Sequence, residues 1–229
     1  MNVTSDTQDS QWGRGRLVGS RLGLAIFCLL AIGCARLPVP VQVIHEDQRL
    51  VIRTERVAKD EGYTHPISLK AVDVARVLKG MSSRERPSTW PLRLFGKTAT
   101  PERLLRDEEL QALAPYLVEG LQAAKPNERV AFALYEPGLN PIYERIVTSG
   151  WIAVRDPFFH VALDYVGSLQ PQSPTRSYYP FYPEIPPAPP SYEVFFEPQQ
   201  YWMKDPIDGT PAVQFRDYLR TVAPPAEGG

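Results

Sequence analysis

Three consecutive segments with alternating apolar residues constrain the fold of this 229-residue chain most strongly. RVAFALY (129–135) places its apolar residues on one face of a strand. Residues 143–154 form a second predicted strand with a bulge at Gly150, and residues 159–165 alternate strictly in a third. Because only the turn Arg155-Asp156-Pro157 separates the last two, the three strands can form an antiparallel meander.

A β-hairpin is predicted before these strands. VQVIH (41–45) alternates, with its two valines and His45 on one face, and RLVIRTERV (49–57) is rich in β-branched residues. Only the short polar stretch Glu46-Asp47-Gln48 separates them, so the two segments are expected to pair directly.

Two helices are predicted between the hairpin and the meander. The first covers 69–79, with Ser68 as its N-cap and Gly80 as its end, and residues 82–99 after it read as irregular. Thr100-Pro101 is typical of an N-cap and first helical residue, so a second helical region is expected over 101–124. It carries a leucine stripe, namely Leu110, Leu113, Leu117 and Leu121.

Pro115 interrupts the leucine stripe of the second helical region. A proline inside a helix lacks the amide hydrogen and clashes with the preceding turn. We therefore expect either a kink or two short helices that meet at Ala114.

Proline concentrates near the C-terminus, where eight of the twenty residues in 171–190 are proline. This density excludes helix and central strand, so we expect an extended strap over the surface, or alternatively a flexible linker. The remainder is too short for its own core, so the predicted strand 191–197 is expected to return to the same sheet. A closing helix over 211–222 and a disordered tail over 223–229 follow.

Together these elements predict a single α+β domain over 41–222. It has an antiparallel sheet of four to six strands, two or three helices on one face, and the Pro/Tyr-rich strap 171–190. The remaining length after the leader is enough to bury one substantial core.

The N-terminal leader has the three parts of a signal peptide. Arg14, Arg16 and Arg21 precede the apolar run Leu22–Gly33 of twelve residues, which ends on small residues. A membrane-spanning helix needs roughly 20 apolar residues. The sequence therefore predicts a cleaved signal peptide over 1–33.

The junction at Gly33-Cys34 resembles the bacterial lipoprotein lipobox, with Ala31 where leucine is commonest and Leu30 one place early. The resemblance implies that Cys34 becomes the acylated first residue, bearing palmitate-type chains, and that 34–40 form a tether. More than one acyl chain gives stable anchoring. Because Ala35 follows the cysteine, the resemblance implies an outer-membrane lipoprotein facing the periplasm. The alternative is a chance cysteine after an ordinary cleavage site.

The charge and cysteine counts exclude several classes of function. After residue 33 the chain has 22 basic and 24 acidic residues, so it lacks the basic excess of a nucleic-acid-binding protein. Cys28 would be removed with the leader and Cys34 acylated, so a cysteine mechanism is not expected.

No catalytic, metal or cofactor site is predicted. The three histidines (His45, His65 and His160) do not lie at metal-ligand spacing, and there is no GxSxG or SxxK after the leader. The stretch from Asp205 to Gly209 invites a calcium interpretation, but it lacks the alternating ligands and is read as a turn. A paired-carboxylate glycosidase stays open, because no acid pair stands out among many.

An aromatic cluster near the C-terminus gives the only candidate binding residues. Such rings could stack on sugars or hold a partner protein, although packing of the strap onto the domain is favoured. The candidates are Tyr178, Tyr179, Phe181, Tyr182, Tyr201 and Trp202.

The expected function is a lipid-anchored envelope protein that binds another envelope protein or assists an assembly. The alternative is a lipid-anchored hydrolase or a glycan-binding module acting at the cell wall. The expected partners are therefore membrane lipid through Cys34 and either an envelope protein or cell-wall glycan, with no nucleic acid.

Overall fold

The structure is a computed structural model, and it describes residues 39–57, 61–86, 100–171 and 192–222. The leader with Gly33 and Cys34, the strap from 172 to 190, and the tail 223–229 lie outside these residues. The expectations for those segments therefore stay predictions.

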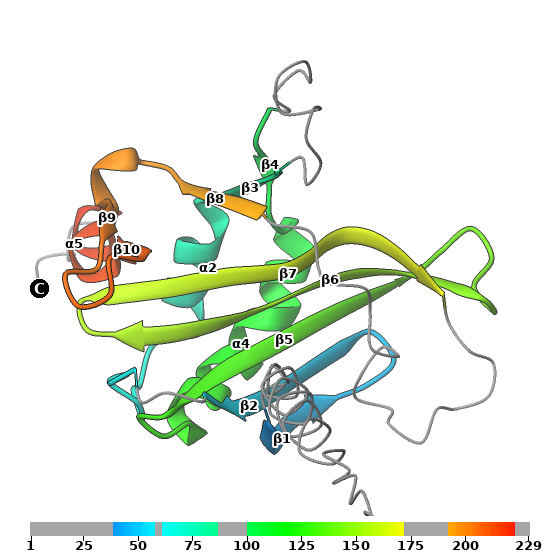
Figure 1. The fold of residues 1–229 in the computed structure, drawn as a ribbon, viewed down its shortest axis with the longest axis horizontal. Coiled ribbons are helices and arrows are strands. Elements are labelled where there is room, and N and C mark those ends of the chain that lie inside the picture. The colour runs from blue at the N-terminus through cyan, green and yellow to red at the C-terminus, as the bar shows by residue number, and fades with distance from the viewer. Residues whose placement is uncertain (1–38, 58–60, 87–99, 172–191, 223–229) are drawn as a thin grey trace, which may run out of the picture. The chain divides into compact units, whose positions relative to one another are not determined.

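A seven-stranded antiparallel sheet forms the main layer (Figure 1). This is more strands than the four to six expected, because the C-terminal residues add two strands beyond the meander. In spatial order the strands are β1 (Val39–Glu46), β2 (Leu50–Arg56), β5 (Glu128–Pro137), β6 (Glu144–Arg155), β7 (Phe158–Pro171), β10 (Pro211–Gln214) and β9 (Trp202–Lys204).

The predicted hairpin and meander are both confirmed. β1 pairs with β2, and β5, β6 and β7 pair in sequence order with antiparallel register. A register irregularity falls at Gly150, as expected. One detail differs, because a bulge between Val43 and His45 turns His45 to the other face, where its ring stacks on Tyr116.

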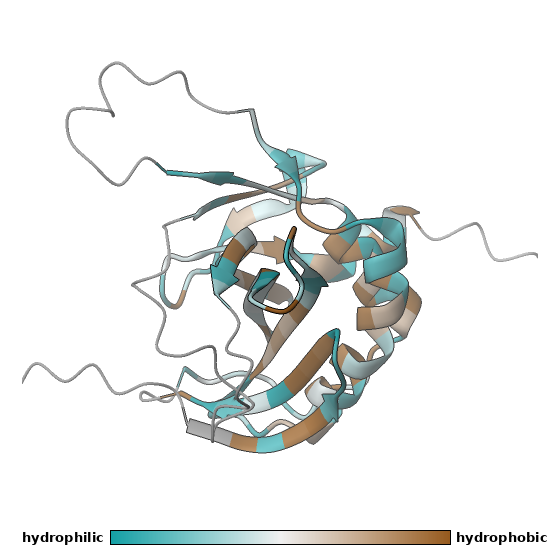
Figure 2. Cartoon of the chain, turned by 90° about the vertical axis from the view of Figure 1, so that its right-hand side faces the viewer, coloured by the Kyte–Doolittle hydropathy of each residue, from teal (hydrophilic) through white to brown (hydrophobic). Residues whose placement is uncertain are grey.

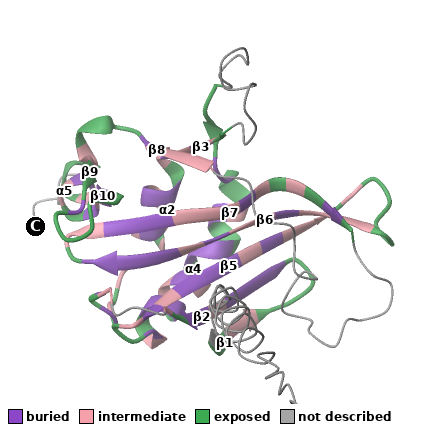
Figure 3. Cartoon of the chain, in the orientation of Figure 1, coloured by how far each residue is buried: buried purple, intermediate pink, exposed green. Residues whose placement is uncertain are grey.

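Helices α2 (Ala71–Lys79) and α4 (Asp107–Ala123) cover one face of the sheet (Figure 2). The leucine stripe of α4 is buried against alternate residues of β2 and β5, which confirms the predicted apolar face. Ile52 and Val130 on the strands are fully buried in this core. Figure 3 shows buried residues along β2 and β5. The sheet's helix-facing side therefore holds the hydrophobic core.

The predicted helix starts were wrong, although both helices exist. Lys70, not Ser68, is the N-cap of α2, while Gly80 ends the helix as expected. Residues after Thr100 form the short strand β4 (Glu102–Arg103), and α4 begins only after its N-cap Arg106. Glu109 accepts the Arg106 amide hydrogen in a capping box, which fixes the start there.

Pro115 lies inside α4, which is one helix over its whole length and not two short ones. Tertiary packing of the leucine face thus outweighs the loss of one backbone hydrogen bond at the proline.

A second, three-stranded sheet corrects two expectations. The segment 82–99 was expected to be irregular, but its first residues belong to β3 (Met81–Glu85), which pairs with β4 and with β8 (Tyr192–Phe196). The strand predicted at 191–197 therefore does not return to the main sheet. Met81 and Phe196 face each other in register and are both buried, so a shared apolar contact brings the strands together.

The C-terminal part closes the main sheet. Residues 211–222, expected to be one helix, divide into β10 and α5 (Phe215–Val222), and Gln199–Tyr201 form the short 3-10 helix η1. Phe215 packs edge-on against Phe159 of β7 at a centroid distance of 6.2 Å, which attaches α5 to the core. Among the described residues, no helix combines the length and the apolar character needed to cross a membrane.

Candidate functional site

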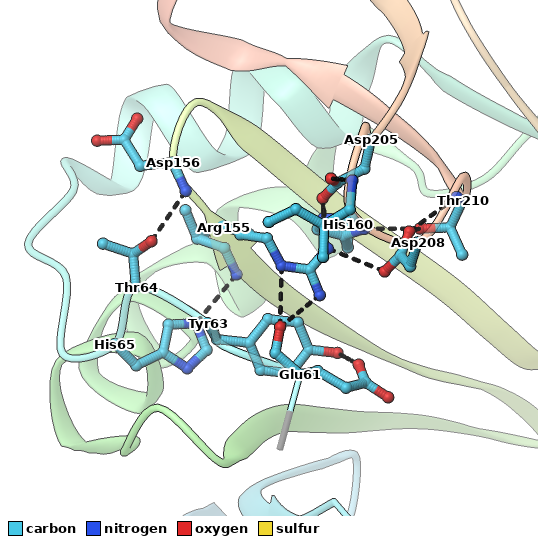
Figure 4. A network of polar contacts seen from close by, with 12 residues as sticks. Glu61, Tyr63, Thr64, His65, Arg155, Asp156, His160, Asp205, Asp208 and Thr210 are labelled. Atoms are coloured by element: carbon cyan, nitrogen blue, oxygen red, sulfur yellow. Dashed lines mark hydrogen bonds and ion pairs between the residues drawn. The ribbon is translucent and has the colours of Figure 1, made fainter. Parts of the chain in front are cut away.

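A cluster of polar side chains lies where β6 and β7 meet the β9–β10 connection (Figure 4). Arg155 ends β6, His160 lies near the start of β7, and Asp205, Asp208 and Thr210 come from the loop between β9 and β10. Arg155, His160 and Asp205 are buried, and Asp205 is fully so. Buried ionisable groups of this kind are common at active sites, so this cluster is a candidate functional site.

Arg155 is the centre of the cluster. Its Nη1 donates to Asp205 Oδ2 at 2.5 Å and to Asp208 Oδ2 at 2.9 Å. Its Nε and Nη2 donate to the Glu61 carbonyl oxygen at 3.0 and 2.6 Å, and the guanidinium lies over the Tyr63 ring. One guanidinium thus joins three segments that are far apart in sequence.

His160 continues the network from the other side of Asp205. Its Nε2 donates to Asp205 Oδ2 at 3.0 Å, and its Nδ1 lies 3.3 Å from the Thr210 hydroxyl oxygen. That hydroxyl donates to Asp208 Oδ1 at 2.5 Å, and the Thr210 amide donates to the same oxygen at 2.8 Å. The second Asp205 oxygen accepts from the Ile207 amide at 2.8 Å.

Burial and the neighbouring Arg155 cation lower the pKa of His160 below its ordinary value of 6.5, so the ring is neutral at pH 7. Burial opposes ionisation of Asp208, but hydrogen bonds from Thr210 and Arg155 lower its pKa to about 2. The Arg155 cation therefore faces an ionised Asp208, in keeping with the contacts between them.

The Asp205 carboxylate, the His160 imidazole and the Thr210 hydroxyl follow one another in the order of a hydrolytic triad. In such a triad the hydroxyl must donate its proton to the imidazole. Here the Thr210 hydroxyl donates its single proton to Asp208, at a shorter distance than its contact with His160. The geometry fixes the 205–210 loop on the sheet and does not activate Thr210.

The predicted turn at Asp205–Gly209 is confirmed, with the Gly209 amide donating to the Asp205 carbonyl at 2.8 Å. Its two aspartates point toward Arg155 (Figure 4). Within the described ranges, no three acidic, histidine or cysteine side chains gather to hold a metal ion.

His65 has a structural role nearby. Its Nε2 accepts the Val154 amide hydrogen at 3.0 Å, so Nδ1 carries the ring proton and donates to the Glu128 carbonyl at 2.9 Å. Burial lowers the pKa of this ring, in keeping with the neutral tautomer.

Of the candidate binding aromatics, only Tyr201 and Trp202 are described. Tyr201 packs edge-on against Tyr218 of α5 and shares a hydrogen bond of 2.8 Å with the Thr221 hydroxyl. Trp202 begins β9 and is half-buried against the core. The structure thus places both rings in packing contacts, whereas Tyr178, Tyr179, Phe181 and Tyr182 lie outside the described residues.

The structure also has an exposed apolar surface, away from the polar cluster, that was not predicted from the sequence. The β5–β6 hairpin projects past the ends of β1 and β2 and is exposed at its turn (Figures 1 and 3). Four large apolar residues are exposed on this turn and on the adjoining part of β7, and we call them the apolar tip. They are Leu139 (99% exposed), Ile142 (62%), Tyr143 (56%) and Leu169 (56%).

The turn of the apolar tip is internally hydrogen-bonded. The Tyr143 and Glu144 amides donate to the Asn140 carbonyl, and the Gly138 amide donates to the Glu144 carbonyl. The run PGLNPIY (137–143) could have indicated this exposed surface from the sequence, because hairpin turns are normally polar and this one carries three large apolar side chains.

Comparison with known proteins found no match to any protein family, to any curated protein, or to any solved structure.

Proposed function

We propose that this chain is a lipid-anchored protein of the bacterial cell envelope that works by binding another envelope component. The anchor is the acylated Cys34 that the lipobox resemblance implies. The apolar tip is the observation that carries the binding role, because soluble monomers rarely gather large exposed apolar side chains without a partner.

A binding role agrees with the state of the polar cluster. Its charged side chains are engaged in holding the 205–210 loop, and the threonine proton is directed to Asp208. The second candidate is a cell-wall hydrolase, because Asp205, His160 and Thr210 follow one another in the order of a triad; it requires the Thr210 hydroxyl to turn from Asp208 to His160.

The anchor and the tip can be tested together in cells. A palmitate analogue should label the protein, and Cys34→Ser should abolish that label. A photo-crosslinking residue at position 139 should form adducts with an envelope component, whereas the same residue at position 207 should not. Ile207 is a matched control because it is an exposed apolar residue in the β9–β10 connection, at the end of the sheet away from the tip and at the edge opposite β1.

Equal adducts at both positions would mean random collision and would contradict a binding tip. Release of sugars or peptides from purified cell wall, lost on Thr210→Val, would replace binding with the hydrolase. Unchanged labelling of Cys34→Ser would remove the lipid anchor from the proposal.

A further inference from the structure

The apolar tip and the start of the domain lie at opposite ends of the sheet. Val39 pairs with Arg56, and Arg56 pairs with Glu128, so the chain enters the sheet where β5 begins. The tip follows Pro137, where β5 ends. At about 3.4 Å per residue, β5 separates the two ends by roughly 30 Å.

The tip has the side chains that suit the boundary between lipid headgroups and acyl chains. Leu139 and Ile142 are aliphatic, and Tyr143 combines an apolar ring with a polar hydroxyl, as interfacial aromatics do. The tip is the turn at the end of a projecting hairpin (Figure 1), a shape that can insert between lipid headgroups.

The backbone of the tip also suits a medium that offers few hydrogen-bond partners. Pro137 and Pro141 have no amide hydrogen, and the amides of Gly138, Tyr143 and Glu144 are bonded within the turn. The Asn140 amide donates to the Glu144 side chain at 3.4 Å. Four of the six amide hydrogens in 137–144 are therefore bonded within the turn, and each of these bonds lowers the cost of moving the segment out of water.

We propose that the apolar tip inserts into the interface of the bilayer that holds the lipid anchor, so that the domain attaches at two points. This proposal rests on the lipid anchoring proposed above and names the component that the tip binds. Insertion is shallow, because Glu136 and Glu144 flank the tip at its base and Glu136 is ion-paired with Arg106.

The anchoring bilayer is the favoured surface because attachment at Cys34 makes the second contact intramolecular. A short connection then raises the effective concentration of the tip at that surface far above that of a free protein. With the two ends attached, the strands lie along the membrane plane and the helix-covered core stays in water.

A fluorescence experiment tests the insertion with the lipidated full-length product. Leu139→Cys is labelled with an environment-sensitive dye, since Cys34 is blocked by its acyl chains, and the protein is reconstituted in phosphatidylcholine vesicles. Lipids brominated on the upper acyl chain should quench the dye at position 139 and leave the fluorescence of a dye at Ile207→Cys unchanged. Leu139 is almost fully exposed, so its replacement leaves the fold intact.

A second variant keeps the label and removes the apolar character. Ile142→Asp with Tyr143→Ser in the Leu139→Cys background should reduce the quenching to that of the Ile207→Cys control. Quenching that survives this change would show that proximity alone, without insertion, produces it and would overturn the proposal.

Flotation with the vesicles tests the lipid anchor separately from the insertion of the apolar tip. Protein that does not float contradicts the lipid anchor itself. Protein that floats without quenching at position 139 agrees with the lipid anchor but contradicts insertion of the tip. The apolar tip would then bind a groove on a partner protein. Quenching only from brominated lipid in a second vesicle population would place the tip on a facing bilayer and would also overturn the proposal.

Discussion

Thr54 of β2 illustrates how one atom can cost stability inside this core. The residue is 1% exposed, and its hydroxyl oxygen lies buried without a hydrogen-bond partner. It shares the helix-facing side of the strand with Ile52 and lies opposite Val130. A buried hydroxyl that makes no hydrogen bond has lost its water without compensation.

Thr54→Val should therefore raise the free energy of unfolding by about 1 kcal/mol, because it keeps the branched shape and removes the unpaired hydroxyl. Denaturant unfolding of the two proteins measures the difference. Thr54→Ser is the control: it keeps the hydroxyl and deletes a buried methyl group, so it should lower stability by about 1 kcal/mol. A valine variant no more stable than the parent would contradict the assignment.

At the level of elements, the β6–β7 pair depends on a close backbone approach at Gly150. A Cβ atom added there would lie 2.2 Å from the Ala162 carbonyl oxygen and 3.1 Å from the Leu163 Cα. Both neighbours are main-chain atoms of the paired strand, so they can yield only if the ladder itself shifts. The register irregularity beside Gly150 marks this place in the pairing.

Gly150→Ala should lower the free energy of unfolding by about 3 kcal/mol, because the added methyl group forces β6 and β7 apart in the middle of the sheet. Thermal unfolding should show the loss as a lower Tm. Ser149→Ala, one residue earlier in the same strand, should change stability by less than about 1 kcal/mol. Equal effects of the two substitutions would show that the strands adapt to the extra atom.

For the whole molecule, two buried histidines make stability depend on pH. The pKa values of His65 and His160 are both lowered from 6.5 in the folded state, first by burial. The unfolded chain then binds more protons below pH 6.5, so the free energy of unfolding falls as the pH falls. Each histidine contributes up to about 1.4 kcal/mol per pH unit until its folded-state pKa is reached.

Unfolding measured in denaturant should therefore show stability that is level above pH 7 and decreases from pH 6.5 toward pH 5. Asp164, whose pKa is raised by burial, has the opposite sign and adds stability as the pH falls through its folded-state pKa. His160→Gln should weaken the slope, because it removes one of the two titrating rings. A flat profile in the parent would contradict the neutral, buried state of both histidines.

Local regularities predicted much of the fold. The strands 41–45, 49–57, 129–135, 143–154 and 159–165 and the two helices all exist, because alternation and helical spacing report which face of an element is buried. The turn at Asp205–Gly209 was predictable for the same reason, since Asp and Gly determine turn geometry within a few residues. Helix starts were less predictable: Ser68 and Thr100 have the right chemistry, yet Lys70 and Arg106 are the caps.

The sequence by itself determined the periodicity of the strands, the leucine face of α4 and the lipobox resemblance at Gly33-Cys34, because each depends on residues close together in the chain. Only the tertiary structure decided that β8 joins β3 in a second sheet, since an alternating strand does not specify its partner. It also decided that Arg155 meets Asp205 across 50 residues, and that Leu139 and Leu169 are exposed at one end of the sheet. Burial and long-range contact belong to the folded chain as a whole, and so does the apolar tip.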